Sequence, residues 1–371
     1  RQPVIEKYFE NELMITASDE LLADSQGLAL EQLHGDAPDG PAGELARHFL
    51  QAAPLGTQGK AVKYFNRAGK RALTLYAFHD AMYYFEQALA AVGPEPSERR
   101  RRLGLRLQAA TASWRANFGA RARERYREAI GDARILKDRP ALVDATMGFA
   151  HASPRIGVSD PDAVEIIEGT LALVGNDDSP DRARLLGTLG EMFYAGNDHE
   201  RAERYSQEGL EMARRIGNKD ALLHTGLTRS MVLVGWGDTA RRLSLAAEML
   251  AVESAPIELH CAALQMHILG LLEDGSIGSA TRQVGVLFEL AERTRQPQSM
   301  WFAHLYRASL HILAGRWDDA VTHATTALEL CRADSNPGVL EFFILMMFMA
   351  RYLFSKSGEA NTSALHCSAG V

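Results

Sequence analysis

A helical pattern that returns about every forty residues is the feature that most constrains this chain. The segment AFHDAMYYFEQALAAVGPEP, residues 77–96, places Ala81, Phe85 and Ala88 at positions i, i+4 and i+7, which share one face of an α-helix. Near the other end, AGRWDDAVTHATTALEL repeats this spacing from Ala320 onward. A pattern that recurs so far along the chain predicts an array of similar units.

Alanines in equivalent surroundings mark the units. They are Ala81, Ala122, Ala163, Ala202, Ala240, Ala280 and Ala320. A turn-forming segment precedes each one, and six of these seven segments contain glycine. A second breaker separates the units, and in most cases it ends in a proline at the start of the next helical segment, where proline is well tolerated. Each unit is therefore predicted to be two helices of about 15 residues joined by a tight turn.

The turns carry their own expectations. Glycine is expected to supply the left-handed residue that ends one helix, and Asp or Ser is expected to cap the next. Sustained alternation of β-branched residues, the signal of strands, is almost absent. We therefore predict an all-α fold of seven units and part of an eighth, wound as a right-handed solenoid with a period near 40.

Composition agrees with an extended array and narrows the setting. A chain of 371 residues is long for one core, and its net charge of −7 is not typical of a nucleic-acid or anionic-membrane binder. The three cysteines lack CxxC spacing, which indicates a reducing compartment and no zinc site. The first residues do not form a signal peptide, and the apolar segment 339–354 is too short to cross a membrane. We expect a cytoplasmic protein with that segment as a buried helix.

The repeat resembles the tetratricopeptide repeat, whose second helix carries alanine, an aromatic residue four positions on and alanine three further. Ala122, Tyr126 and Ala129 also match, and Gly69 and Gly190 stand where that family has its first-helix glycine, the second within LGEMF. Several units depart from the pattern at the aromatic or the last alanine. The departing residues are Ile167, Thr170, Ser206, Gly209, Ser244, Val284 and Leu287.

Residues 21–92 carry a closer resemblance. LLADSQGLALEQLHGDAPDGPAGELARHFLQAA, followed shortly by KAVKYFNRAGKRALTLYAFHDAMYYFEQALAAV, is similar to the segment after the ATPase module in bacterial signalling ATPases. These include LuxR-type regulators of the maltose-regulator kind and ATPase-fused adenylate or guanylate cyclases. The resemblance implies a helical linker over 1–40 that leads into the repeat array over 41–354. The tail over 355–371 consists of small and polar residues, and we expect it to be disordered or truncated. The chain itself contains no phosphate-binding G-x-x-x-x-G-K-[ST] motif, because GTQGK at 56–60 has the wrong spacing.

Candidate chemistry is sparse. His260, Cys261 and His267 lie within one helical segment, but no third ligand accompanies the two histidines, so packing is favoured over metal binding. The run SERRRRLGLRL at 97–107 is favoured as a solvated helix start over a nucleic-acid patch. No Ser-His-Asp or Cys-His arrangement is evident. We therefore expect no catalytic residue, no metal and no cofactor.

Binding residues are predicted from the tetratricopeptide register, in which the first helices line the concave surface. That register gives Asn66, Lys70, Thr111, Trp114, Arg115, Glu191, Tyr194, Thr225, Arg229 and Gln265. The favoured function is a protein-interaction and regulatory scaffold from a bacterial signal-transduction ATPase or transcriptional regulator, with a protein, peptide or attached ATPase as partner. The alternative is a small-molecule sensor that controls an attached domain. A tight apolar pocket would favour the sensor, and an open charged groove would favour a protein partner.

Overall fold

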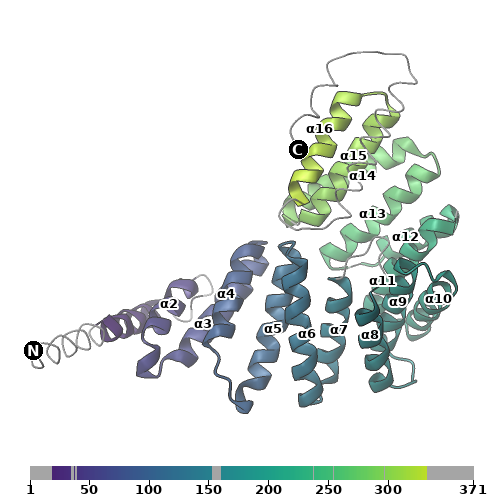
Figure 1. The fold of residues 1–371 in the computed structure, drawn as a ribbon. Coiled ribbons are helices and arrows are strands. Elements are labelled where there is room, and N and C mark those ends of the chain that lie inside the picture. Colours follow the sequence, from purple (N-terminus) through teal and green to yellow (C-terminus); the bar gives the residue numbers. More distant parts are fainter. Residues whose placement is uncertain are drawn as a thin grey trace, which may run out of the picture. The chain divides into compact units, whose positions relative to one another are not determined.

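The computed structural model describes residues 19–331 except 35–36, 38–39, 153–159, 237, 254 and 296. Residues 19–34 are helical and the chain continues as consecutive α-helices (Figure 1). These are α2 (Ala42–Gln51), α3 (Gln58–Thr74), α4 (Phe78–Ala91), α5 (Arg99–Arg115), α6 (Gly119–Leu136), α7 (Arg139–His151), α8 (Pro161–Val174), α9 (Pro180–Ala195), α10 (His199–Ile216), α11 (Lys219–Val232), α12 (Thr239–Leu250), α13 (Ile257–Glu273), α14 (Ile277–Thr294), α15 (Pro297–Leu313) and α16 (Trp317–Cys331). The predicted helix at 339–354 and the tail at 355–371 lie outside the described residues.

The helices form pairs that repeat at the predicted period. The first helices of successive pairs begin at Gln58, Arg99, Arg139, Pro180, Lys219, Ile257 and Pro297. These starts are 38 to 41 residues apart. Strands are absent from the described ranges, so the prediction of an all-α array of two-helix units is confirmed.

Four turns confirm the capping prediction, whereas Ser276 at the start of α14 makes no cap hydrogen bond, and the prediction about glycine needs correction. The side chains of Asp160, Ser179, Asp198 and Asp238 each accept a hydrogen bond from the backbone N–H three residues on. Gly275 has the left-handed φ expected of it. In the turns that contain NFG and GND, however, asparagine takes that conformation instead of glycine. The two residues are Asn117 at φ 70° and Asn197 at φ 60°. Asparagine tolerates the left-handed region because its short side chain bonds locally.

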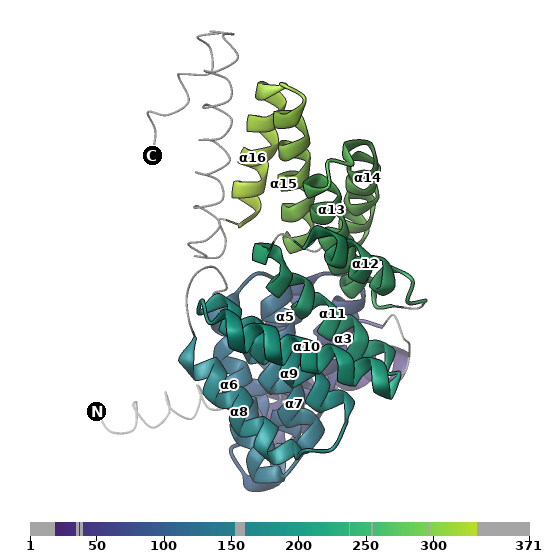
Figure 2. The same cartoon turned by 90° about the vertical axis from the view of Figure 1, so that its right-hand side faces the viewer.

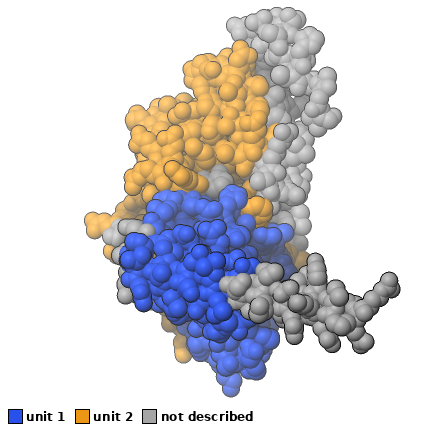
Figure 3. Space-filling model, turned by 90° about the vertical axis from the view of Figure 1, so that its left-hand side faces the viewer, with its two compact units in different colours: residues 1–116, 120–145 blue, residues 117–119, 146–371 orange. Residues whose placement is uncertain are grey.

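The chain divides into two compact units, coloured separately in Figure 3. Unit 1 comprises residues 1–116 and 120–145, and unit 2 comprises residues 117–119 and 146–371. The two are described separately below.

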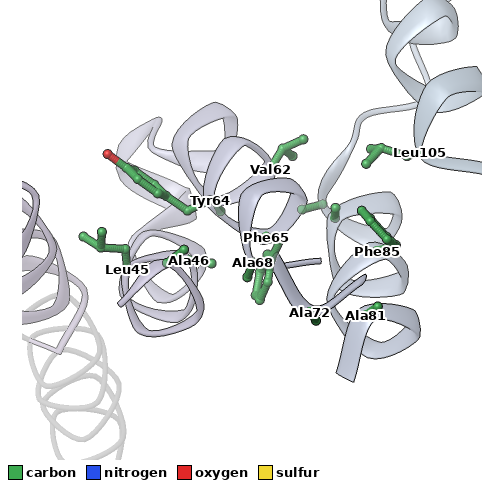
Figure 4. Packing of buried hydrophobic residues seen from close by; sticks show 14 of the residues in the cluster. Leu45, Ala46, Val62, Tyr64, Phe65, Ala68, Ala72, Ala81, Phe85 and Leu105 are labelled. Carbon is green, nitrogen blue, oxygen red and sulfur yellow. The ribbon is translucent and has the colours of Figure 1, made fainter. Parts of the chain in front are cut away.

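The core of unit 1 includes close packing of an aromatic residue against small ones. Ala81, Phe85 and Ala88 are fully buried on α4 and belong to the core cluster shown in Figure 4. A Cβ on Gly69 of α3 would lie 2.6 Å from the ring of Phe85. The missing side chain at Gly69 therefore provides the space that the phenyl ring fills, as expected for this repeat.

The basic run at the start of α5 is used for ion pairs within unit 1. Arg106 bonds Asp132 of α6 and also pairs with Glu128, while Arg100 lies 2.9 Å from Asp138. Arg102 donates to the carbonyl of Gly93. Arg100 and Arg101 are exposed, as a solvated helix start predicts, whereas Arg102 and Arg106 are half-buried and bond to neighbouring segments.

Unit 2 is built around its first helices. Helix α11 packs against both α9 and α13, and α13 also contacts α15. The approach of α9 to α11 is close, because a Cβ on Gly187 would lie 2.6 Å from Thr228 Oγ1. Direct packing of neighbouring first helices joins them into one layer, and each second helix packs against its partner, as α15 and α16 do in Figure 2.

Candidate functional site

The contact between α9 and α10 replaces the aromatic interlock with backbone packing. Ser206 stands at the position that Phe85 holds in α4, four residues after the marker alanine. A Cβ on Gly190 would lie 2.7 Å from the Ser206 nitrogen, and one on Gly209 would lie 2.8 Å from the Gly187 nitrogen. Two helices that touch through glycines leave no room for a ring at this position.

The hydroxyl of Ser206 accepts a hydrogen bond from a buried arginine of the next helical repeat. Arg229 on α11 is 2 % exposed and donates to Ser206 Oγ across 3.1 Å. Its guanidinium also forms a two-pronged pair with the carboxylate of Glu203 on α10. A buried guanidinium is tolerated only with such charge-matched acceptors.

A second buried arginine lies on α12. Arg242 is 1 % exposed, and Glu273 at the end of α13 pairs with it. The same carboxylate accepts a hydrogen bond from Thr239 at 3.0 Å. Burial lowers the pKa of Arg242 from its usual value. Sequence reasoning missed this residue, because Arg241 beside it is exposed and nothing in the local pattern distinguishes the two.

The residues predicted to line the groove in unit 2 are mostly inside the protein. Glu191, Thr225, Arg229 and Gln265 are 7 % exposed or less, and Tyr194 is half-buried. The hydroxyl of Thr225 donates to the Ala221 backbone carbonyl at 2.7 Å, and the backbone carbonyl of Gln265 accepts from the Tyr306 hydroxyl at 3.0 Å. The Thr225 hydroxyl, the Arg229 guanidinium and the Gln265 backbone carbonyl therefore bond to groups of the protein itself. A role of these residues in binding a partner stays a prediction.

The predicted residues of unit 1 are more accessible. Lys70 is exposed, and Asn66, Thr111, Trp114 and Arg115 are half-buried. The hydroxyl of Thr111 donates to the Leu107 carbonyl, and the guanidinium of Arg115 lies 5.8 Å from the centre of the Phe78 ring. These side chains lie on α3 and α5, as the register predicts, and their contact with a partner is likewise a prediction.

A hollow of about 250 Å³ lies among α8, α9 and α10 within unit 2. Its apolar lining is Leu171, Ala172, Leu186, Leu189 and Tyr205. Its polar lining is Glu168, Asn176, Arg182 and Glu208. The leucines at 186 and 189 are buried while Glu168 and Asn176 are exposed, so the hollow has an apolar floor and a charged mouth open to solvent.

The histidine and cysteine pattern of α13 does not form a metal site. Cys261 is buried, and burial raises the pKa of its thiol to about 11, so the thiol stays protonated near neutral pH. Burial also lowers the pKa of His267. No cluster of three or more His, Cys, Asp or Glu side chains that could hold a metal ion occurs in the described part of the chain.

Three histidines gather between α15 and α16. The Nδ1 atoms of His304 and His323 are 3.0 Å apart, and the ring of His311 stacks on His323 with centroids 5.3 Å apart. Phe288 of α14 meets the His304 ring edge-on. Burial lowers the pKa of all three histidines, that of His304 to about 4. The cluster is therefore neutral near pH 7.

Over residues 19–331, apart from the gaps given above, no helix is both long and apolar enough to cross a bilayer.

Comparison with known proteins finds likeness in structure only. No family model matches the chain, and no curated protein matches it. The apo form of the quorum sensor NprR from B. thuringiensis is 12% identical with a TM-score of 0.50, over 89% of this chain and 94% of that one. Rap protein complexed with competence and sporulation factor is 11% identical with a TM-score of 0.49, over 96% and 100% of the two chains.

A third similar structure belongs to a longer protein. It is a signal transduction ATPase with numerous domains and a tetratricopeptide repeat sensor from Pyrococcus horikoshii, 13% identical with a TM-score of 0.43. The match covers 88% of this chain and 50% of that protein, so this chain spans about half its length. Together with the paired helices and their period, the likeness to the NprR structure defines the fold class of this chain. It is an all-α helical-repeat protein of the tetratricopeptide-like solenoid kind.

Proposed function

We propose that this chain is a non-catalytic scaffold that binds a peptide or protein segment. The observation that carries the proposal is the hollow among α8, α9 and α10. At about 250 Å³ it is smaller than the roughly 300–1,000 Å³ of pockets that enclose a small-molecule ligand, and its mouth is charged and open. One side chain of a partner fits such a hollow, whereas a small inducer would remain largely in water.

The wider setting follows from the sequence resemblance. Residues 21–92 support an origin in a bacterial signal-transduction ATPase or transcriptional regulator, with 1–40 as linker and 41–354 as the array. In that setting the partner is a protein, a peptide or the attached ATPase. The region acts in the cytoplasm without a cofactor and without direct contact to nucleic acid or membrane. Helical-repeat domains of this kind generally bind and do not catalyse.

The test compares peptides with small molecules on the same protein. The 371-residue chain is screened against an immobilised octapeptide library, and its thermal unfolding is recorded with a panel of sugars and nucleotides. We expect peptide binding, and no metabolite that raises the melting temperature, since a native-state ligand must raise it by mass action. A melting shift with one metabolite and no peptide binding would establish the sensor function instead.

A matched pair of variants connects binding to the hollow. Ala172 is exposed on α8 and lines the hollow, so Ala172→Trp should fill it and weaken peptide binding. Ala247 is equally exposed on α12 away from the hollow, and Ala247→Trp should leave binding unchanged. Equal affinities for both variants and the wild type would exclude the hollow from binding.

A further inference from the structure

We infer that the hollow among α8, α9 and α10 receives a lysine or arginine side chain of the partner. The inference rests on the proposed function, because it specifies which side chain a bound segment inserts. The same hollow that admits one side chain also carries the charges that select it.

The floor of the hollow suits the aliphatic part of a long side chain. Leu186 and Leu189 on α9 are 2 % and 1 % exposed, and Leu171 on α8 stands beside them. Tyr205 on α10 is held in place, because Phe193 stacks on its ring with centroids 5.6 Å apart. Lysine and arginine bury their methylene stems along such apolar surface and keep the charged end in water.

The mouth of the hollow carries an excess of negative charge. Glu168 on α8 and Glu208 on α10 both line it, and the Glu208 side chain is 42% exposed. The one basic lining residue, Arg182, is already engaged. It donates to the Gly175 carbonyl at 2.8 Å and lies 3.8 Å from Glu208. Among the lining side chains, two carboxylates and one guanidinium leave a net charge of −1, which a cationic side chain would complement. The Arg204 guanidinium, which is not a lining group, lies 4.6 Å from the centre of the Tyr205 ring.

The other classes of side chain fit less well. A glutamate would face Glu168 and Glu208 as like charges. A neutral side chain of the same length would fill the floor, but it would shield the carboxylates from water without giving them a partner. Norleucine has nearly the shape of lysine without the charge, so a comparison of the two isolates the electrostatic part of recognition.

The experiment uses octapeptides with lysine, arginine, norleucine or glutamate at one central position among alanines and glycines. Their binding to the 371-residue chain is measured by fluorescence polarisation. We expect the lysine and arginine peptides to bind about tenfold more tightly than the norleucine peptide. The double variant Glu168→Gln, Glu208→Gln should remove that preference and leave the norleucine affinity unchanged. Glu211→Gln, on α10 outside the hollow, is the control and should change neither affinity.

A second measurement reads the hollow directly. N-acetyl-lysine N-methylamide and its norleucine analogue are titrated into protein with labelled leucine methyl groups. The lysine compound should shift the signals of Leu171, Leu186 and Leu189 at a lower concentration than the norleucine compound. Equal titrations, or a lysine preference that survives the double variant, would overturn the inference.

The outcomes separate this inference from the proposed function. Peptide binding without preference for a cation refutes the inference and leaves the scaffold function standing. Preference for the glutamate peptide would assign the hollow to recognition by Arg182, which also refutes it. If no peptide binds and neither amino-acid derivative shifts the leucine signals, both the proposed function and the inference fail.

Discussion

The guanidinium of Arg229 on α11 donates a hydrogen bond to Ser206 Oγ on α10, 3.1 Å away. In the second helices α4 and α6, the position of that serine is held by the rings of Phe85 and Tyr126. A ring at this position fills the space between two helices of one unit. The serine, together with Glu203 one turn away, instead bonds to the first helix of the next repeat. At α10 a polar connection between two successive helical repeats has therefore replaced the aromatic packing within one repeat.

Removing Glu203 should destabilise the protein more than replacing Arg229. Glu203→Ala leaves a guanidinium that is 2 % exposed without its carboxylate, so the free energy of unfolding should fall by about 3 kcal/mol. Arg229→Met replaces the buried cation with an apolar chain of similar length and leaves a carboxylate that is 33% exposed to water. The loss should then be only about 1 kcal/mol. Urea unfolding followed by circular dichroism measures both values.

The control for this pair lies at the start of α12. Arg241 and Asp238 form an exposed pair there, and Arg241→Ala should change stability by less than about 0.5 kcal/mol. Equal losses for Glu203→Ala and Arg229→Met would show that burial of the guanidinium is not what makes the contact matter.

Glycines in the helices of unit 2 are predicted to respond in opposite directions. The added Cβ in Gly190→Ala would meet the Ser206 nitrogen at 2.7 Å, and backbone cannot move aside easily. We expect a loss of about 2 kcal/mol from overpacking. Gly285 on α14 has nothing within 4 Å of that position, so Gly285→Ala should stabilise the helix by about 0.5–1 kcal/mol.

Thermal unfolding of the two alanine variants beside the wild type gives the signs directly. A stabilising Gly190→Ala would mean that α9 and α10 separate readily, and that the close contact does not hold this pair together.

Much of this architecture could be predicted from the sequence, because the same helical pattern recurs in each repeat and each recurrence supports the others. The spacing of Ala81, Phe85 and Ala88 predicted that these residues share one face of a helix, and the Asp and Ser caps were predicted from the turn composition. The contact of Phe85 with Gly69 was seen only in the structure. The exposure of the predicted groove residues could not be predicted from the sequence. Exposure of residues such as Thr225 and Arg229 depends on how closely neighbouring first helices approach. That distance is set by Gly187 against Thr228, a contact between residues far apart in the chain.

Acid should loosen the pair α15 and α16. Burial lowers the pKa values of His304 and His323 below the usual 6.5 or so, that of His304 to about 4. Repulsion from His323 adds to the shift at His304, and repulsion from His311 adds to the shift at His323. The guanidinium of Arg307 lowers both further, and the Asp319 carboxylate opposes this at His323. The folded state therefore binds fewer protons than the unfolded state between about pH 6.5 and pH 4, and stability falls as the pH drops through that window.

Hydrogen exchange measured by mass spectrometry at pH 7 and pH 5, corrected for the intrinsic pH dependence, tests this locally. Peptides from α15 and α16 should lose protection at pH 5, while those from α9 and α10 should change little. His323→Phe removes the paired imidazole and should flatten the response. A response of the same size in that variant would place the titrating groups elsewhere.

The last prediction concerns the ion pair between Arg125 of α6 and Glu86 of α4, which joins two successive helical repeats. Arg125 and Glu86 are 39 residues apart, one repeat, and form two hydrogen bonds of 2.9 and 2.7 Å. Their side chains are only 25% and 21% exposed, and bonding to Glu86 raises the pKa of Arg125. A double-mutant cycle with Arg125→Ala and Glu86→Ala should give a coupling free energy of about 1 kcal/mol. The same cycle on the more exposed pair Arg101 and Glu98 should give less than about 0.5 kcal/mol, because water and salt screen it. Equal coupling in the two cycles would mean that ion pairs between successive helical repeats add no more to stability than ordinary surface pairs. Apolar packing alone would then set the period of the array.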